Sequence, residues 1–258
     1  RALNASLRAA NPLAVVAIDE DADVVIVGTG GAAFAAAVTA AEAGASVVML
    51  DKMDVIGGNT NAGEGTLNAP DPDRQNAQGV EDSVEHFYTD TYEGGDEKGN
   101  PDLVHILADN SLDAVRFMEN HGLKYEDACF TAIGGKWCRG HAVDVEKKGE
   151  QGGSYYVSNL RASAEKLGVK VYGNAKVESL IIEDGKVIGV KGTRSNGAAV
   201  LATGKSVIMA TGGYARNAQL AMQYDTRVTT DMPSSNVCSS TGDGIGLGQS
   251  AGADLANM

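Results

Sequence analysis

Three small residues and one acidic residue have the types and the spacing needed to hold a diphosphate and a sugar. Gly28, Gly30 and Ala33 fit the pattern G-x-G-x-x-[G/A]. In this pattern the first glycine makes a tight turn, the second lets the backbone approach a pyrophosphate, and the third position permits close packing of a helix. Asp51 lies 23 residues beyond Gly28, where a carboxylate accepts hydrogen bonds from a ribose hydroxyl. The set predicts a dinucleotide site; the alternative for the glycines alone is a tight structural turn.

The residues around this motif have the pattern of a βαβ unit. Residues 24–27 are an apolar strand before the glycines, residues 32–44 are a helix of small residues, and residues 46–50 are a second apolar strand. Such a unit joins parallel strands by a right-handed crossover. It places a phosphate at the N-terminus of the helix, where free N–H groups favour negative charge. We therefore expect an α/β, Rossmann-like domain with a central parallel sheet and flanking helices.

The rest of the chain alternates between irregular, helical and strand patterns. Residues 56–73 are rich in Gly, Asn, Pro and Asp and predict a long irregular loop. The remaining expected elements are helices within 80–92, 100–122 and 154–167, a strand over 169–173, a hairpin over 175–193 that forms a β-meander insertion, a strand over 206–213, and a turn into a helix over 240–253.

Composition limits the partners of the chain. Its 258 residues carry a formal net charge of −13, which repels nucleic acids and anionic membrane surfaces. No apolar run approaches the roughly 18 residues of a membrane span. The three cysteines, Cys129, Cys138 and Cys238, form no metal-binding or CxxC pattern, so we expect neither structural disulfides nor a metal. The chain begins at Arg1 without a leader pattern, and we expect a soluble protein that is either cytoplasmic or exported.

The loop after Asp51 bears on the choice between NAD and FAD, which share the glycine motif. It carries Gly57-Gly58-Asn59-Thr60 and then Gly65. Here the chain resembles the flavoprotein family of fumarate reductases and succinate dehydrogenases (FAD-dependent oxidoreductase 2). It is most similar to the branch of flavocytochrome c fumarate reductases and urocanate reductases, in which a G-G-N-[ST] loop wraps FAD. Bare backbone amides can pack against the pyrophosphate and flavin, and Asn and Thr supply short hydrogen-bonding groups.

Three later stretches resemble the same family. The hairpin at 175–193 resembles the segment whose backbone, here at Val177, meets the adenine, and residues 207–217 and 234–253 resemble two further cofactor-contacting segments. The resemblance runs from about Asp23 to the C-terminus. Motif and resemblance together predict these cofactor-binding residues: Gly28, Gly30, Gly31, Ala32, Ala33, Asp51, Lys52, Gly57, Gly58, Asn59, Thr60, Gly65, Thr66, Val177, Ala210, Thr211, Gly212, Gly213 and Asp243.

The loop also departs from the family pattern. Where the family has a double glycine this chain has Gly65-Thr66, preceded by Glu64. The Glu64 carboxylate either lies near the flavin edge or points to solvent. Members with covalent FAD use a histidine in this loop, and none lies between Gly57 and Ala69. The resemblance therefore implies FAD that is held non-covalently.

Histidines and cysteines are the remaining candidates for chemistry. His86, His105 and His121 fall within helical patterns and predict packing or surface roles. His141 lies in a glycine-rich stretch that resembles a region near the flavin in the family, so a site role stays open beside a structural one. Cys138 has no resolving cysteine beside it and predicts a buried or idle thiol rather than a redox group.

The resemblance implies the activity of a flavin-dependent oxidoreductase. Hydride from the reduced flavin would reach one carbon of an activated C=C bond, in fumarate or a related unsaturated carboxylate, while a cationic acid protonates the other carbon; the reverse dehydrogenation is equivalent. In the family that acid, the capping domain and the final FAD segment follow the T-G-D-G helix, so we expect them beyond Met258. No catalytic residue is nominated.

The sequence therefore predicts an N-terminal arm over residues 1–22 and the N-terminal portion of an FAD-binding domain over residues 23–258. No haem attachment motif is present, so electrons would arrive from an external donor domain or protein. The alternatives are a flavin-binding module without turnover, or a relative of the 3-ketosteroid dehydrogenases or aspartate oxidases.

Overall fold

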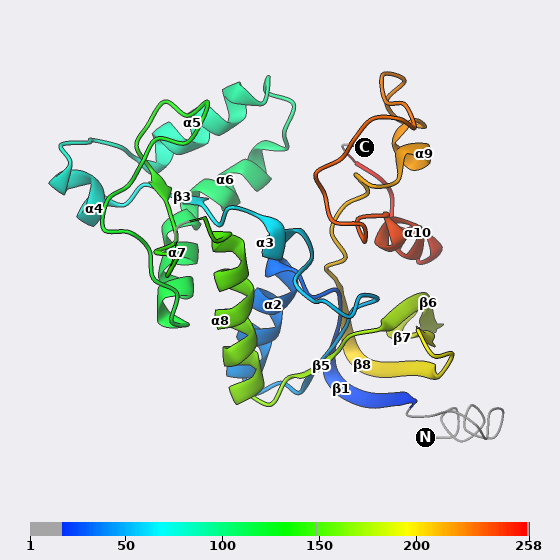
Figure 1. Ribbon diagram of the computed structural model, residues 1–258. Helices are drawn as coiled ribbons and strands as arrows, with labels where there is room; N and C mark the ends of the chain where they lie inside the picture. Colours follow the sequence, from blue (N-terminus) through cyan, green and yellow to red (C-terminus); the bar gives the residue numbers. More distant parts are fainter. Residues whose placement is uncertain (1–16, 148, 257) are drawn as a thin grey trace. The chain divides into compact units, whose positions relative to one another are not determined.

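The computed structural model describes residues 17–147, 149–256 and 258 (Figure 1). The chain divides into two compact units where the sequence suggested one domain. Among the described residues, the first unit consists of those up to Ala62 together with Leu160–Met258, and the second of Gly63–Asn159. Of the predicted N-terminal arm, residues 1–16 lie outside the described part. Residues 18–22 belong to the first strand instead.

A six-stranded sheet forms the centre of the first unit. Its order is β5-β2-β1-β8-β7-β6. β1 pairs in parallel with β2 and β8, and β2 with β5, whereas β6, β7 and β8 pair antiparallel as a meander. The predicted meander is therefore confirmed, but it completes the central sheet, which is mixed rather than wholly parallel. The strands are β1 (Ile18–Val27), β2 (Val47–Leu50), β5 (Lys170–Tyr172), β6 (Ala175–Glu183), β7 (Lys186–Arg194) and β8 (Ala199–Met209).

The predicted βαβ unit is confirmed. Helix α2 (Gly31–Glu42) connects β1 to β2, and the two strands run in register from Val24↔Val47 to Val27↔Leu50. The small side chains of α2 let it pack closely, with Ala33 and Phe34 fully buried. β1 begins at Ile18, six residues before the predicted start. Its acidic first half pairs only with β8, starting at Ile18↔Val200, so one strand edge and part of its surface face solvent and tolerate charge.

The core of the first unit is built mainly from the strands of this sheet. Buried side chains of β1, β2, β6, β7 and β8 form one apolar cluster, which also contains Leu247 of helix α10 (Asp243–Ser250). Two short helices complete the unit, α3 (Gly58–Ala62) and α9 (Ala218–Ala221). The C-terminal segment is thereby anchored to the sheet by an apolar contact as well as by the polar contacts described below.

The second unit is mainly helical. It contains α4 (Pro72–Ala77), α5 (Val84–Gly94), α6 (Pro101–Asp109), α7 (Ser111–Asn120) and the antiparallel pair β3 (Leu67–Asn68) and β4 (Gly140–His141). Helix α8 (Gly152–Lys166) begins in this unit, and its residues from Leu160 belong to the first. Among the described residues, no helix has both the length and the apolar character that a bilayer crossing requires.

Two predictions of secondary structure between residues 56 and 122 were wrong. The expected loop over 56–73 contains α3, β3 and the start of α4. The expected single helix over 100–122 is two helices that meet at Asn110, because polar side chains there compete for backbone groups. The side-chain amide of Asn110 donates to the Ile106 carbonyl at 2.8 Å, and the Ser111 hydroxyl donates to the Ala108 carbonyl at 2.8 Å.

Candidate nucleotide-binding site

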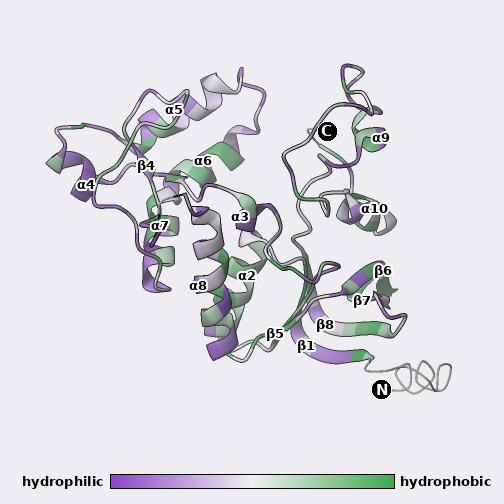
Figure 2. Ribbon diagram, in the orientation of Figure 1, coloured by the Kyte–Doolittle hydropathy of each residue, from purple (hydrophilic) through white to green (hydrophobic). Residues whose placement is uncertain are grey.

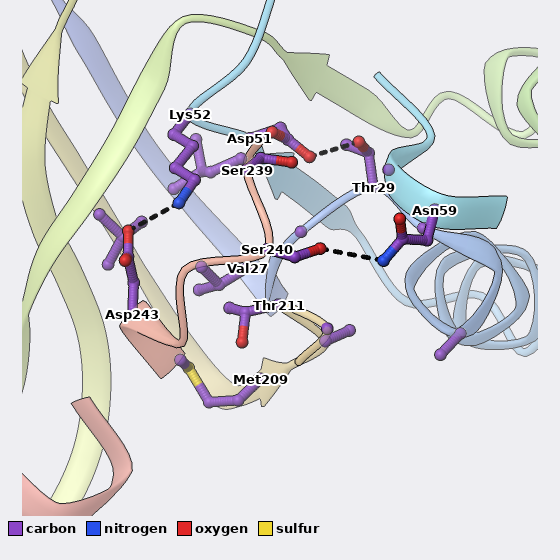
Figure 3. A pocket seen from close by; sticks show the side chains of 18 of the residues that line it. Val27, Thr29, Asp51, Lys52, Asn59, Met209, Thr211, Ser239, Ser240 and Asp243 are labelled. Carbon is purple, nitrogen blue, oxygen red and sulfur yellow. Dashed lines mark hydrogen bonds and ion pairs between the residues drawn. The ribbon is translucent and has the colours of Figure 1, made fainter. Parts of the chain in front are cut away.

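A cavity of about 300 Å³ lies in the first unit, where three neighbouring parallel strands end (Figure 3). Val27, Leu50 and Met209, the last residues of β1, β2 and β8, line it. In open α/β sheets, ligands bind at this edge of the strands. Fourteen of the nineteen predicted site residues line the cavity: Gly28, Gly30, Gly31, Ala32, Asp51, Lys52, Gly58, Asn59, Thr60, Val177, Ala210, Thr211, Gly212 and Asp243.

The first two glycines of the motif are required for different reasons. Gly28 has φ +112°, and a Cβ there would collide with the carbonyl of Ala210, so any side chain would separate the ends of β1 and β8. Gly30 has the extended angles φ −72° and ψ −177°. A Cβ on Gly30 would have Thr60 Oγ1 as its nearest atom, at 3.7 Å. Gly28 therefore serves the fold, and Gly30 leaves open backbone on the cavity.

The N-terminus of α2 has the character of an anion site. Gly30 is its N-cap residue and has no side chain with which to cap the helix, and the first turn carries no acidic residue. The Gly31 amide donates to Thr60 Oγ1 at 2.9 Å, which leaves the Thr60 hydroxyl proton free to point elsewhere. Free amides and the helix dipole favour negative charge at this position.

Asp51 is held in one orientation at the end of β2. The Thr29 hydroxyl donates to Asp51 Oδ2 at 2.5 Å, and the Met53 amide donates to Asp51 Oδ1 at 2.8 Å. Thr29 is almost fully buried and also accepts from the Gly57 amide at 3.0 Å. Each carboxylate oxygen keeps a further lone pair, so Asp51 can still accept from the hydroxyls of a sugar. Sequence reasoning missed Thr29, which occupies an unspecified position of the motif.

Lys52 connects the end of β2 to the start of α10. Its ammonium donates to Thr241 Oγ1 at 2.5 Å and to Asp243 Oδ2 at 3.0 Å, and Thr241 Oγ1 donates to Asp243 Oδ1 at 2.6 Å. Partial burial opposes the charge of Asp243, but the hydrogen bonds from Thr241 and Lys52 outweigh it and keep the pKa of this carboxyl below its usual value. The ion pair fixes α10 beside the cavity.

Asn59 connects the segment at residues 58–62 to the segment at residues 236–240. Its side-chain amide donates to Asn236 Oδ1 at 2.7 Å and to Ser240 Oγ at 2.9 Å, and its Oδ1 accepts from the Val237 amide at 2.9 Å. With both amide hydrogens engaged, Asn59 acts as a bracket between residues 58–62 and 236–240 rather than as a free donor. Ser239 and Ser240, which sequence reasoning also missed, both line the cavity, and Ser240 accepts one of these hydrogen bonds.

We expect Asn59→Ala to loosen this bracket. The substitution removes three hydrogen bonds, each of which contributes roughly 0.5–1.5 kcal/mol. Hydrogen exchange at the Val237 amide should accelerate by at least about tenfold, which corresponds to 1.4 kcal/mol. Asn59→Asp is the matched control, because it keeps the acceptor for Val237 and should protect that amide more than alanine does. Equal exchange in the parent, Asn59→Asp and Asn59→Ala would show that the contact stabilises nothing.

Five predicted residues do not line the cavity. Ala33 lies on the buried face of α2, the Gly57 amide donates to Thr29, and the Gly213 carbonyl accepts from the Gly242 amide at 3.2 Å. These three residues contribute packing or hydrogen bonds next to the cavity without lining it. Gly65 and Thr66 belong to the second unit, where a Cβ on Gly65 would collide with the backbone at the start of α8. Glu64 is exposed, in agreement with the solvent-facing alternative.

His141 belongs to a buried ionic network of the second unit. Its side chain is fully buried, with Nε2 3.2 Å from Asp71 Oδ2 and Nδ1 3.1 Å from the Arg139 carbonyl. Asp71 also accepts from Arg74 and Arg116. Burial opposes the charge of Asp71, but hydrogen bonds from Arg74 and His141 prevail and keep the pKa of its carboxyl below the usual value. These contacts give His141 a structural role.

The other three histidines pack against aromatic rings, which is one of the two roles predicted for them. His86 stacks on Trp137, His105 stacks on Tyr88, and His121 meets the edge of Phe117. The three cysteines are free thiols. Burial raises the pKa of Cys129 to about 11, and Cys138 Sγ donates to the Cys129 carbonyl at 3.0 Å. Among the described residues, no three His, Cys, Asp or Glu side chains gather as a metal site.

Comparisons with known proteins find similar sequences over nearly the whole chain. A family model described as "FAD binding domain" matches residues 23–258. The chain is 33% identical over 243 residues to an NADH:fumarate oxidoreductase of Klebsiella pneumoniae, and 34% identical over 253 residues to a urocanate reductase of Eggerthella lenta. These alignments cover 92% and 96% of this chain but 25% and 41% of the relatives. The chain thus spans less than half the length of either protein.

Solved structures of similar fold also cover nearly the whole of this chain. The open conformation of a flavocytochrome c3 fumarate reductase superposes with a TM-score of 0.85 at 32% identity, covering 98% of this chain and 43% of that one. A 3-ketosteroid-Δ4-(5α)-dehydrogenase from Rhodococcus jostii superposes with a TM-score of 0.83 at 25% identity, covering 94% of this chain and 56% of that one.

Proposed function

The chain belongs to the family of FAD-binding domains whose model spans residues 23–258, and from this premise we propose how it binds and uses FAD. The cavity at the ends of β1, β2 and β8 holds the cofactor non-covalently. The chain is the FAD-binding part of an oxidoreductase that reduces an activated C=C bond in an unsaturated carboxylate, or runs the reverse dehydrogenation. An external domain or protein supplies the electrons.

The residues of the cavity fit an adenine dinucleotide. The open backbone at Gly30 and the N-terminus of α2, of whose amides Gly31 already donates to Thr60, suit the diphosphate, with the Thr60 hydroxyl as a further donor. Asp51, fixed by Thr29, suits the ribose hydroxyls. The backbone at Val177 of β6, which also lines the cavity, is proposed to meet the adenine. The observation that carries the proposal is this pairing of a helix N-terminus without acidic residues and an oriented carboxylate.

FAD supplies the hydride chemistry when it is bound. The chain's own residues bind and orient it: the amides at the start of α2 hold the anion, and Asp51 fixes the sugar. Val27, Leu50, Met209 and Leu247 supply apolar wall that excludes water. The Lys52–Asp243 ion pair and the Asn59 bracket hold the C-terminal segment against the cavity.

The class of substrate is proposed from the relatives. Two of them are named for fumarate and urocanate, and both compounds carry a C=C bond conjugated to a carboxylate. We assign no catalytic acid within this chain. Among the described residues, no arginine lines the cavity, and Arg139 is engaged in ion pairs with Asp82 and Asp90.

The proposed reaction is tested by substrate-dependent oxidation of a reduced dye, with FAD present and fumarate, urocanate or a 3-ketosteroid as acceptor. We expect this chain to bind FAD. We expect the unsaturated acids to support turnover only in a polypeptide that also carries the acid catalyst. Turnover with the steroid alone would favour a dehydrogenase of the ketosteroid kind, which the superposition with such an enzyme makes the second candidate. In that same polypeptide, FAD binding without turnover on any acceptor would identify a flavin-binding module.

We expect Asp51→Ala to weaken FAD binding by about 1–3 kcal/mol, because the ribose hydroxyls lose a charged acceptor. Titration followed by flavin fluorescence measures the change. Asp54→Ala is the matched control: Asp54 lies in the same loop, is exposed, and bonds Asn174 rather than lining the cavity. An unchanged dissociation constant for Asp51→Ala would show that the ribose does not bind at Asp51.

A further inference from the structure

Helix α6 exposes a row of large apolar side chains. Leu103, Ile106 and Leu107 are 62%, 60% and 53% exposed, and their spacing of three and four residues puts them on one helix face. We call these three residues the α6 stripe. Of the whole helix only Ala108 is buried, and Figure 2 shows hydrophobic colour along α6. A contiguous apolar patch is informative where scattered apolar residues are not.

The segment that carries the stripe is the most acidic part of the chain. Residues 81–113 contain ten acidic residues and one lysine, so they hold a net charge of −9 out of the chain's −13. Asp82 and Asp90 are engaged with Arg139. The other eight acidic residues are exposed, and two of them, Asp102 and Asp109, lie at the two ends of α6. We call these eight residues the acidic rim: Glu81, Glu85, Glu93, Asp96, Glu97, Asp102, Asp109 and Asp113.

Carboxylates from different elements gather around one point of this surface. Tyr88 of α5 stacks on His105 of α6, with ring centroids 3.7 Å apart. Burial in this stack raises the pKa of Tyr88, and the negative charges of Glu85, Asp102 and Glu97 raise it further. The α6 stripe and six of the eight rim residues therefore lie on α5, α6 and the loop between them, whereas Glu81 precedes α5 and Asp113 lies on α7.

We propose that the α6 stripe and the acidic rim form a docking surface for a separate protein that presents a basic amphipathic helix. The apolar face of that helix would cover Leu103, Ile106 and Leu107, and its lysines and arginines would meet the rim. The helical spacing of the stripe suits ridge-into-groove packing by a second helix. The charge selects the partner: a second copy of this chain, with net charge −13, would be repelled, as would nucleic acid or an anionic membrane. The inference does not depend on the proposed function.

A simple helical peptide of leucine and lysine, about 18 residues or five turns long, is the probe. Its binding to the 258-residue chain is measured by fluorescence anisotropy, beside the same peptide with glutamate in place of lysine. We expect the lysine peptide to bind and the glutamate peptide not to bind. Ile106→Ser should weaken binding at least about tenfold, or 1.4 kcal/mol. Ile133→Ser is the matched control, because Ile133 is fully exposed in the same unit, and both variants leave the charge unchanged.

A second pair of variants tests the rim. Asp102→Asn with Asp109→Asn should lower the affinity and reduce its dependence on salt, because fewer ion pairs then form. Asp144→Asn with Glu165→Gln removes the same charge outside the rim and should leave both unchanged.

Four results would overturn the proposal. Equal binding by the parent chain and Ile106→Ser would mean that charge alone attracts the peptide, and absence of binding by the parent would mean that the surface takes no such helix. A dimer in sedimentation that Ile106→Ser dissociates would identify a second copy as the occupant. Binding to this chain but not to a longer polypeptide that contains it would mean that part of that polypeptide covers the stripe.

Discussion

A Gly30→Val variant is expected to fold like the parent chain and to bind FAD at least about 100-fold more weakly, a loss of roughly 2.7 kcal/mol. The extended backbone at Gly30 accepts a β-branched residue, and the nearest atom to its new Cβ is 3.7 Å away. The branched side chain would then project into space that the diphosphate requires. Thermal unfolding and FAD titration on the same sample separate the two effects.

Two further glycine variants sharpen this test. Gly94→Val places the same side chain where no atom lies within 4 Å, outside the cavity, and should leave FAD binding unchanged. Gly28→Val should instead damage the fold itself, because its side chain collides with the backbone of Ala210. A Gly30→Val protein that retains bound FAD at parental affinity would show that the phosphates lie elsewhere.

Arg139→Met is expected to destabilise the chain by about 3–5 kcal/mol, since it leaves a buried carboxylate without its partner. Arg139 Nε and Nη2 donate to the two oxygens of Asp82 at 2.8 Å each, and Nη2 also donates to Asp90 at 3.1 Å. The Asp82 side chain is fully buried and that of Arg139 is 6% exposed. Urea unfolding measures the free energy of unfolding.

Arg161→Met serves as the control for the loss of an arginine. Arg161 pairs with Glu165 across one helix turn, and both side chains are about half exposed, so its loss should change the free energy of unfolding by less than roughly 0.5 kcal/mol. Adding Asp82→Asn to Arg139→Met should restore part of the lost stability, because the unpaired charge is then removed. Similar small losses for Arg139→Met and Arg161→Met would refute a buried ionic role for Arg139.

The parts of the fold that the sequence predicted are those encoded by nearby residues. Strand, glycine turn, helix and second strand follow one another between Val24 and Leu50, and the hairpin turn at Asp184-Gly185 is equally local. The start of β1 was missed because its acidic residues are stabilised by pairing with β8, about 180 residues away. The break at Asn110 was missed because helical periodicity continues across it, while side-chain bonds to the backbone end the first helix.

In the site, too, local patterns in the sequence were predictive and contacts between distant residues were not. The motif and the family resemblance named fourteen of the residues that line the cavity, but not the contacts that hold them. Thr29 fixes Asp51 from an unspecified motif position, and Asn59 bonds Ser240, 181 residues later. His141 meets Asp71, 70 residues earlier, and no spacing in the sequence indicates such a pair. Side-chain contacts between distant segments require the folded chain.

Hydrogen exchange of the chain with and without FAD tests the central claim most directly. If the diphosphate lies on the start of α2 and the sugar on Asp51, FAD should slow exchange at the amides of residues 30–33 and 51–53, and at 57–60 and 239–243 around them. The effect should vanish in Gly30→Val. Binding of FAD that leaves the exchange of residues 30–33 unchanged would contradict the account.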